Sequence, residues 1–278
     1  MLRRATIVGV AALWWISLAA AQSVVWLEPY AGKLKHVRVT VAGAERQFLF
    51  DTGGGYTLVT PQLARLIGCT PSGRIAGFRM TGARFDTATC ASVRLTIGSL
   101  PSRVEAVGVF DLMALLPKEL PALEGVISLA SFRAQRVTLD LAGGRMIVGA
   151  ESNGVPFPCR AATGLDGSNY VLFASVERSG SAYWFEIDSG NLDSVLVAPH
   201  AAPQFGLDPT TKEATETDLA LGQSASARVS VRVANILYDG VLSAQFLEGG
   251  TLSANLSDAP TCRWQPRAQR SATGVEQP

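Results

Sequence analysis

One short pattern occurs twice in this chain of 278 residues and constrains its fold more than any other feature. The copies are Asp51-Thr52-Gly53 and Asp188-Ser189-Gly190, and each follows a short run of mostly apolar residues. A proline comes ten residues after Asp51 and eleven after Asp188. Two later runs extend the match, Gly125-Val-Ile-Ser128 and Gly240-Val-Leu-Ser243. Because order, chemistry and spacing all recur, we predict two related lobes of roughly 120 residues each.

The residues around both copies are typical of short β-strands separated by turns. Val37–Val41 alternates apolar and polar side chains, as a half-buried strand does. A short helix is predicted to begin at Pro61, with Thr60 as its N-cap and Gly68 at its end. The fold class is therefore mostly β. Further strands are expected at 47–50, 104–109, 136–141, 146–148, 170–176, 182–187 and 227–233.

The N-terminal residues 1–21 have the parts of a secretory signal peptide. Arg3 and Arg4 precede an apolar run, and Ala19-Ala20-Ala21 supplies small residues for cleavage. The alternative is an uncleaved membrane anchor, but the run is short for a bilayer span. We therefore predict an exported protein, periplasmic or secreted, with no stable membrane insertion after cleavage.

The four cysteines indicate disulfides. Cys69, Cys90, Cys159 and Cys262 all follow residue 21, and none forms a CxxC pair. In an oxidising compartment this number favours two disulfides over a metal or redox site. Three connectivities are possible, and the sequence does not choose among them. We favour Cys69–Cys90 and Cys159–Cys262, because the repeat then places each pair within one half.

Over residues 35–256 the sequence resembles the aspartic proteases, the pepsin and retropepsin group. The resemblance is carried by Leu49–Gly53 and Glu186–Gly190, with the apolar pairs Val126-Ile127 and Val241-Leu242. It implies two pseudo-symmetric β lobes with a cleft between them. We expect a first lobe over 22–149, a connection over 150–168, a second lobe over 169–264 and a loose tail over 265–278.

The same resemblance implies a catalytic pair, Asp51 and Asp188. Two carboxylates about 3 Å apart cannot both ionise, so they share one proton. The ionised member can take a proton from water while the protonated member polarises a peptide carbonyl. Thr52 and Ser189 would hydrogen-bond across to the opposite loop. Gly53 and Gly190 would let the two turns approach closely.

Such a site also needs a flap, a hairpin that closes over the bound peptide. By position it should fall within 74–85, with Gly77, Phe78 and Phe85 as candidate residues. Ordinary turns would explain the glycines of this segment equally well.

Several residues depart from the family pattern. Gly54 and Asn191 follow the motif glycines, where the family usually has Ser, Thr or Ala. Ser128 and Ser243 follow the apolar pairs, where glycine is usual. The leading hypothesis is an exported, monomeric aspartic endopeptidase that binds a peptide or protein substrate as an extended strand. The alternative is a catalytically inactive module of the same fold that binds a peptide or protein partner.

Composition and motifs argue against other functions. A formal net charge of +1 does not suit a nucleic-acid binder. The sequence has only two histidines, His36 and His200, and has no phosphate-binding glycine loop or HExxH motif. We therefore expect neither a metal nor a cofactor.

Overall fold

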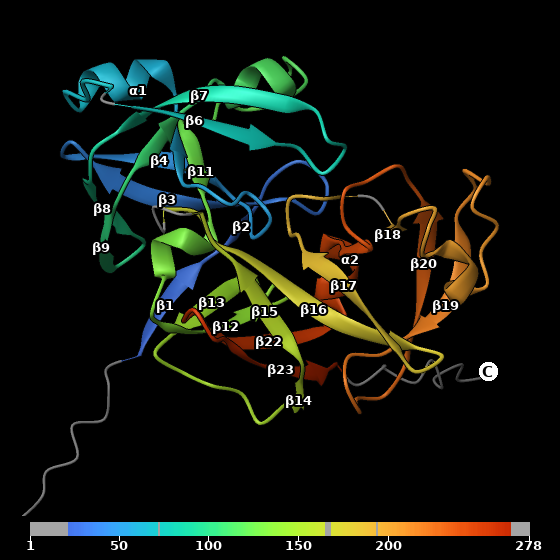
Figure 1. The fold of residues 1–278 in the computed structure, drawn as a ribbon. Helices are drawn as coiled ribbons and strands as arrows, with labels where there is room; N and C mark the ends of the chain where they lie inside the picture. Colours follow the sequence, from blue (N-terminus) through green and yellow to red (C-terminus); the bar gives the residue numbers. More distant parts are fainter. Residues whose placement is uncertain (1–21, 72, 165–167, 193, 268–278) are drawn as a thin grey trace, which may run out of the picture.

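The computed structural model describes residues 22–71, 73–164, 168–192 and 194–267, and most of its regular structure is β-strand (Figure 1). The strands form three sheets, which we call the first-lobe, second-lobe and central sheets. In Figure 1 they lie at the upper left, at the right and at the lower centre, respectively. The signal peptide predicted over residues 1–21 lies outside the described residues.

The first-lobe sheet holds Asp51 at the end of a central strand. That strand, β4, pairs in parallel with β11 and antiparallel with β3. β3 buries Val37, Val39 and Val41, as its alternating sequence predicts. In spatial order the strands are β6 (Gly73–Phe78), β7 (Arg84–Cys90), β10 (Val107–Val109), β5 (Leu58–Val59), β11 (Gly125–Ile127), β4 (Ala44–Phe50), β3 (Lys35–Val41), β8 (Val93–Ile97) and β9 (Leu100–Val104), with β2 (Glu28–Pro29) beside β3.

The second-lobe sheet repeats the central part of this arrangement. β17 runs parallel to β21, β21 is antiparallel to β18, and β18 runs parallel to β20. The equivalent strands of the first lobe are β4, β11, β5 and β10, with the same directions. The sequence repeat is therefore a repeat of topology. The strands in order are β15 (Cys159–Ala162), β16 (Val171–Arg178), β17 (Ser181–Ile187), β21 (Gly240–Leu242), β18 (Val195–Val197), β20 (Ala227–Val233) and β19 (Thr215–Leu219).

The central sheet joins the two halves of the chain. At its middle β12 pairs antiparallel with β22, from Arg136 opposite Asn255 to Leu139 opposite Leu252. The order is β1 (Ser23–Trp26), β13 (Arg145–Val148), β12 (Arg136–Asp140), β22 (Gly250–Asn255), β23 (Thr261–Pro266) and β14 (Val155–Phe157).

Helices are short and lie at strand ends. α1 (Pro61–Leu66) begins as its sequence predicts: the Thr60 side chain accepts a hydrogen bond from the Leu63 N–H at 3.2 Å. Gly68 follows the helix with a φ of 68°. The others are α2 (Ala244–Glu248) and the 3-10 turns η1 (Leu112–Leu115), η2 (Leu129–Phe132) and η3 (Ala202–Phe205).

The structure differs from the sequence-based expectations in three places. The strand expected over 104–109 is two strands, β9 and β10, because Ala106 between them adopts a φ of 52°. The segment 150–168, expected to connect the lobes, also supplies β14 to the central sheet and β15 to the second-lobe sheet. β23 continues through Pro266, two residues into the segment expected to be a tail.

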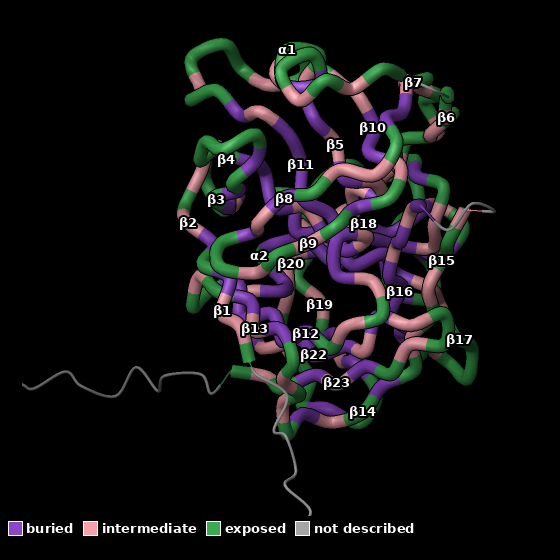
Figure 2. The backbone as a smooth tube through the Cα atoms, turned by 90° about the vertical axis from the view of Figure 1, so that its left-hand side faces the viewer, coloured by how far each residue is buried: buried purple, intermediate pink, exposed green. Residues whose placement is uncertain are grey.

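The three sheets pack around a shared apolar core, and the buried parts of the chain run through its interior (Figure 2). Val37, Leu139 and Phe185, one from each sheet, belong to the same buried cluster. Two disulfides are present, Cys69–Cys90 and Cys159–Cys262, which are the favoured pairs. In the described part of the chain no helix is long and apolar enough to cross a membrane.

Candidate active site

The two motif aspartates occupy equivalent positions at the ends of β4 and β17. The Asp51 N–H donates to the Ile127 carbonyl and the Asp188 N–H donates to the Leu242 carbonyl, each at 3.0 Å. Ile127 and Leu242 end β11 and β21, the strands that run parallel to β4 and β17. Each aspartate is therefore held where two parallel strands end together.

Glycine brings the two aspartate loops into contact. A Cβ added at Gly53 would lie 2.6 Å from Cγ of Asp188, and one added at Gly190 would lie 2.6 Å from Cγ of Asp51. Each carboxyl group thus lies against the opposite loop's backbone, where a side chain would collide. The Gly53 N–H donates to Asp51 Oδ1 at 2.9 Å and the Gly190 N–H donates to Asp188 Oδ1 at 2.8 Å. The two carboxyl groups are close enough to act on each other's pKa.

Thr52 and Ser189 join the loops beneath the carboxyl groups. The Thr52 N–H donates to Ser189 Oγ at 3.1 Å, and the Ser189 N–H donates to Thr52 Oγ1 at 2.9 Å. The Thr52 hydroxyl donates to the Ile187 carbonyl at 2.7 Å, and the Ser189 hydroxyl donates to the Phe50 carbonyl at 3.4 Å. Both side chains are buried. These bonds fix the relative positions of the two lobes at the site.

Burial and charge act on the pKa of both aspartates, and most strongly on that of Asp188. Burial raises the pKa of both, and the charges of Asp51 and Glu186 raise the pKa of Asp188 further. In contrast, the hydrogen bond from Asp188 and the N–H groups of Gly53 and Gly54 lower the pKa of Asp51. The two carboxyl groups can therefore share one proton, with the pKa of Asp188 raised more strongly than that of Asp51, the arrangement that a general base beside a general acid requires.

A third carboxyl group, which the sequence analysis did not single out, lies close to this pair. Glu186 comes two residues before Asp188 in β17 and is only 4% exposed. Burial, followed by the charge of Asp51, raises its pKa to about 8. One signal could have revealed it: a glutamate stands in a strand that is otherwise apolar before Asp188, where the first copy has Leu49. Among the described residues no three His, Cys, Asp or Glu side chains are grouped as a metal site.

The segment expected to be a flap is the β6–β7 hairpin. A Cβ at Gly77 would lie 2.4 Å from the Phe85 ring, so the glycine makes room for that ring, while Phe78 is 58% exposed. The turn reaches the second lobe: the Leu237 N–H donates to the Met80 carbonyl at 2.8 Å. Met80 also packs on an apolar cluster formed by Leu196, Ala198, Ile236 and Val241. The hairpin therefore spans from one lobe to the other.

The residues that depart from the family pattern are accommodated differently in the two lobes. A Cβ at Gly54 would lie 3.3 Å from Asp51 Oδ2, whereas Asn191 donates its N–H to Asp188 Oδ1 at 3.1 Å. The Ser128 hydroxyl donates to the Gly55 carbonyl at 3.3 Å. The Ser243 hydroxyl is buried and has no hydrogen-bond partner among the described residues.

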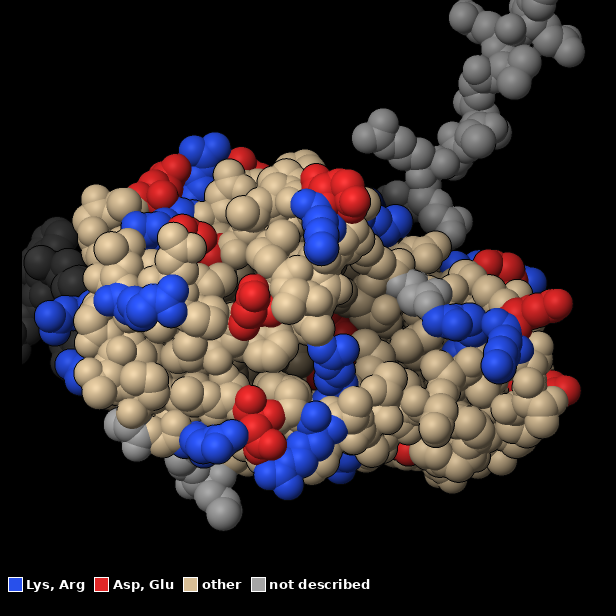
Figure 3. Space-filling view, turned by 90° about the horizontal axis from the view of Figure 1, so that it is seen from above, with Lys and Arg blue, Asp and Glu red and all other residues tan. Residues whose placement is uncertain are grey.

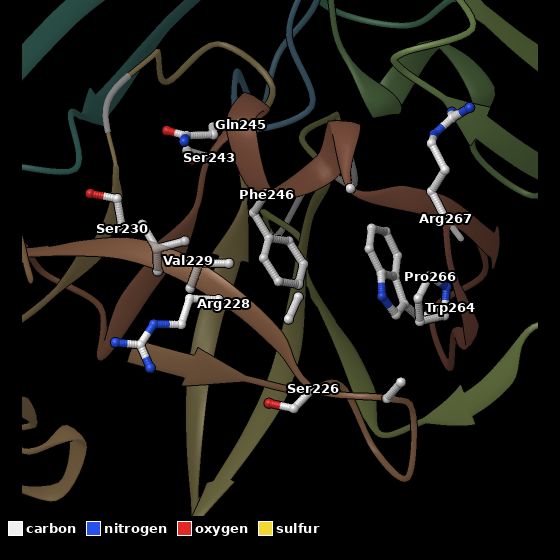
Figure 4. Close-up of a pocket in the computed structure, with 14 residues that line it drawn as sticks. Ser226, Arg228, Val229, Ser230, Ser243, Gln245, Phe246, Trp264, Pro266 and Arg267 are labelled. Carbon is white, nitrogen blue, oxygen red and sulfur yellow. The ribbon is translucent and has the colours of Figure 1, made fainter. Parts of the chain in front are cut away.

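A large cavity of about 1010 Å³ lies elsewhere, between β20, α2 and β23 (Figure 4). The rings of Phe246 and Trp264 stack beside it, with 5.1 Å between their centres. Neither aspartate lines it. The candidate active site is therefore separate from this cavity.

Comparisons with known proteins support the fold alone. No protein-family model matches the chain, and no curated protein matches it either. Among solved structures it is similar to the crystal structure of basic 7S globulin from soybean, with a TM-score of 0.55 and 11% sequence identity. The match covers 88% of this chain and 96% of that one. With the two related β lobes described above, this similarity shows a pepsin-like fold.

Proposed function

We propose that the protein is an exported aspartic endopeptidase that hydrolyses peptide bonds through Asp51 and Asp188. One observation carries the proposal: two carboxyl groups from equivalent loops are close enough to act on each other's pKa, and each lies against the glycine of the opposite loop. One chain supplies both groups, so the monomer suffices for catalysis. The two disulfides are typical of proteins from oxidising compartments.

The proposed reaction needs no covalent intermediate. Ionised Asp51 takes a proton from a water molecule, whose oxygen attacks the carbonyl carbon of the substrate. Protonated Asp188 gives its proton to the carbonyl oxygen, which forms a tetrahedral diol. Asp51 then passes its proton to the peptide nitrogen, the C–N bond breaks, and Asp188 recovers a proton from the diol. The products are a carboxylic acid and an amine, and the pair returns to its starting state.

The substrate would bind as an extended strand beneath the β6–β7 hairpin. The tip of this hairpin is attached to the second lobe by the Leu237 to Met80 hydrogen bond, so it must open for a peptide to enter. Because burial raises the pKa of both aspartates, both limbs of the pH–rate profile should lie above the ordinary carboxyl range.

A binding module without catalysis is the second candidate. The observation that favours it is Gly54, which leaves Asp51 Oδ2 without the hydroxyl donor that a serine or threonine would place there. A peptide could still bind between the lobes under the same hairpin.

Cleavage of a mixed peptide library by residues 22–278, from pH 3 to pH 8, tests the proposal. Asp51→Asn and Asp188→Asn should each lower the rate by about 10²- to 10⁴-fold or more. Asp111→Asn is a matched control, because Asp111 is exposed and its side chain makes no capping hydrogen bond. Full activity of Asp51→Asn would refute the mechanism. A folded protein that cleaves nothing at any pH would favour the binding module.

A further inference from the structure

The repeat allows the two sides of the site to be compared residue by residue. In the first lobe Leu49 of β4 lies opposite Val126 of β11. In the second lobe Glu186 of β17 lies opposite Val241 of β21. Each residue precedes its aspartate by two positions, so its side chain leaves the strand on the same face as that aspartate. The two lobes therefore present different chemistry at equivalent places beside the catalytic pair.

Apart from the two aspartates and Tyr238, the side chains that pack around Leu49 and Glu186 are apolar. Leu49 belongs to a cluster with Val126 and other buried leucines. Beside Glu186, Val241 belongs to a matching cluster that also contacts Met80 and Tyr238. On the other side, Phe173 lies opposite Glu186 and contacts the Tyr238 ring, 5.0 Å between ring centres. One carboxyl group thus stands among apolar side chains where its counterpart is a leucine.

No cation of the described chain pairs with this carboxyl group. Neither an ion pair nor a hydrogen bond joins the Glu186 side chain to a described residue. Arg160 lies in the same cross-strand row, two strands away in β15, but its guanidinium stacks on the Trp184 ring at 4.2 Å. A buried carboxylate without a partner is unfavourable, and it is normally paired or neutralised.

We propose that Glu186 determines specificity: its carboxylate receives the side chain of a substrate lysine or arginine next to the scissile bond, on the side that lies over the second lobe. This specificity rests on the proposed endopeptidase function, and it adds the class of peptide that the enzyme would cleave. On the first-lobe side, Leu49 would favour an apolar residue instead. The preferred bond would then lie between one apolar and one basic residue.

The face of the molecule seen from above does not offer a general attraction for basic peptides. On the face seen from above, acidic and basic side chains are interspersed (Figure 3). The preference for basic peptides would therefore come from the buried carboxyl group of Glu186, and this group would act at one position of the substrate.

The preference for a basic over a neutral substrate side chain should strengthen as the pH rises. The titratable groups that interact electrostatically with Glu186 are Asp51, Asp188 and Tyr238, and the hairpin tip adds the apolar Met80. Because Glu186 is mostly protonated below pH 8, it must release a proton to solvent when it pairs with a lysine or arginine. Binding of a basic peptide at pH 6 to 7 should therefore release about one proton, whereas a neutral peptide should release none.

Peptides that differ only in Lys, Arg, Gln or Leu on either side of one bond test the proposal through kcat/KM. We expect the wild type to prefer Lys and Arg over Gln at one of the two positions by about 30-fold or more. Glu186→Gln should abolish this preference, and Glu186→Leu should shift it to leucine. Glu177→Gln, an exposed glutamate at the far end of β16, is the matched control and should keep it.

Non-hydrolysable hydroxyethylene peptides with Lys or Gln at the same positions separate this inference from the proposed function. Their Kd values and the proton release, measured by calorimetry in two buffers, do not require catalysis. If nothing is cleaved but the Lys peptide binds more tightly and Glu186→Gln removes the difference, the specificity role stands and the catalytic proposal fails. The specificity role of Glu186 would be overturned if the wild type bound both peptides equally, or if Glu186→Gln kept the preference for the Lys peptide.

Discussion

Replacing Thr52 by valine removes the hydroxyl that joins the aspartate loops while it keeps the branched shape of the side chain. Two buried groups lose their partner, the Ser189 N–H at 2.9 Å and the Ile187 carbonyl at 2.7 Å. Leaving a buried polar group without a partner destabilises a protein by about 1 to 3 kcal/mol. The free energy of unfolding should therefore fall by about 2 to 6 kcal/mol for the two groups together. Ser189→Ala should lower it less, because the Ser189 to Phe50 bond is long at 3.4 Å.

Urea unfolding followed by circular dichroism measures these changes, with the slope against denaturant checked for constancy. Thr89→Val is the matched control, because Thr89 is also buried in a strand and its hydroxyl makes no hydrogen bond to the described residues. The control should change the free energy of unfolding by less than about 0.5 kcal/mol. A Thr52→Val variant as stable as the Thr89→Val control would show that these bonds do not hold the lobes together.

Three further predictions concern pH and chain connectivity. Gly54→Ser places a hydroxyl near Asp51 Oδ2, so it should lower the pKa of Asp51 and move the acidic limb of the pH–rate profile down by about half a unit to one unit. Glu186 has a folded-state pKa of about 8, above its ordinary value of 4.5. The wild type should therefore lose stability relative to Glu186→Gln as the pH rises from 4.5 through 8, and the difference between their Tm values should widen. Replacing Cys159 and Cys262 by serine opens a loop with a sequence separation of 103 residues and should lower the free energy of unfolding by about 4 to 5 kcal/mol in urea titrations.

Much of the fold could be predicted because local chemistry determines it. Thr60 and Pro61 are sufficient to place the start of α1, and the alternation of Ala227–Val233 matches the bounds of β20. The duplicated aspartate motif predicted two lobes because both copies are embedded in the same order of apolar runs and glycines. The topology of the two lobe sheets follows that order.

The parts that could not be predicted depend on distant residues. Nothing local marks Val155–Phe157 as a strand, since its partner is β23, about a hundred residues later in the chain. Ala106 has a positive φ at a position that carries no glycine to signal a break. Burial of Glu186 arises from packing against strands and a loop that a linear pattern does not bring together. Its place beside the aspartates follows from the equivalence of β17 and β4, which is a property of the folded sheets.

The pairing of β12 with β22 bears on how the molecule is assembled during synthesis. A growing chain completes β12 early, but the strand that covers its edge, Gly250–Asn255, emerges near the C-terminal end. Until then β12 presents unpaired N–H and carbonyl groups, which can recruit a strand from another molecule. We therefore expect a nascent or truncated chain that stops before residue 250 to associate with other copies through this edge. The strands β22 and β23 thus act as a built-in protection against aggregation, available only after they have been synthesised.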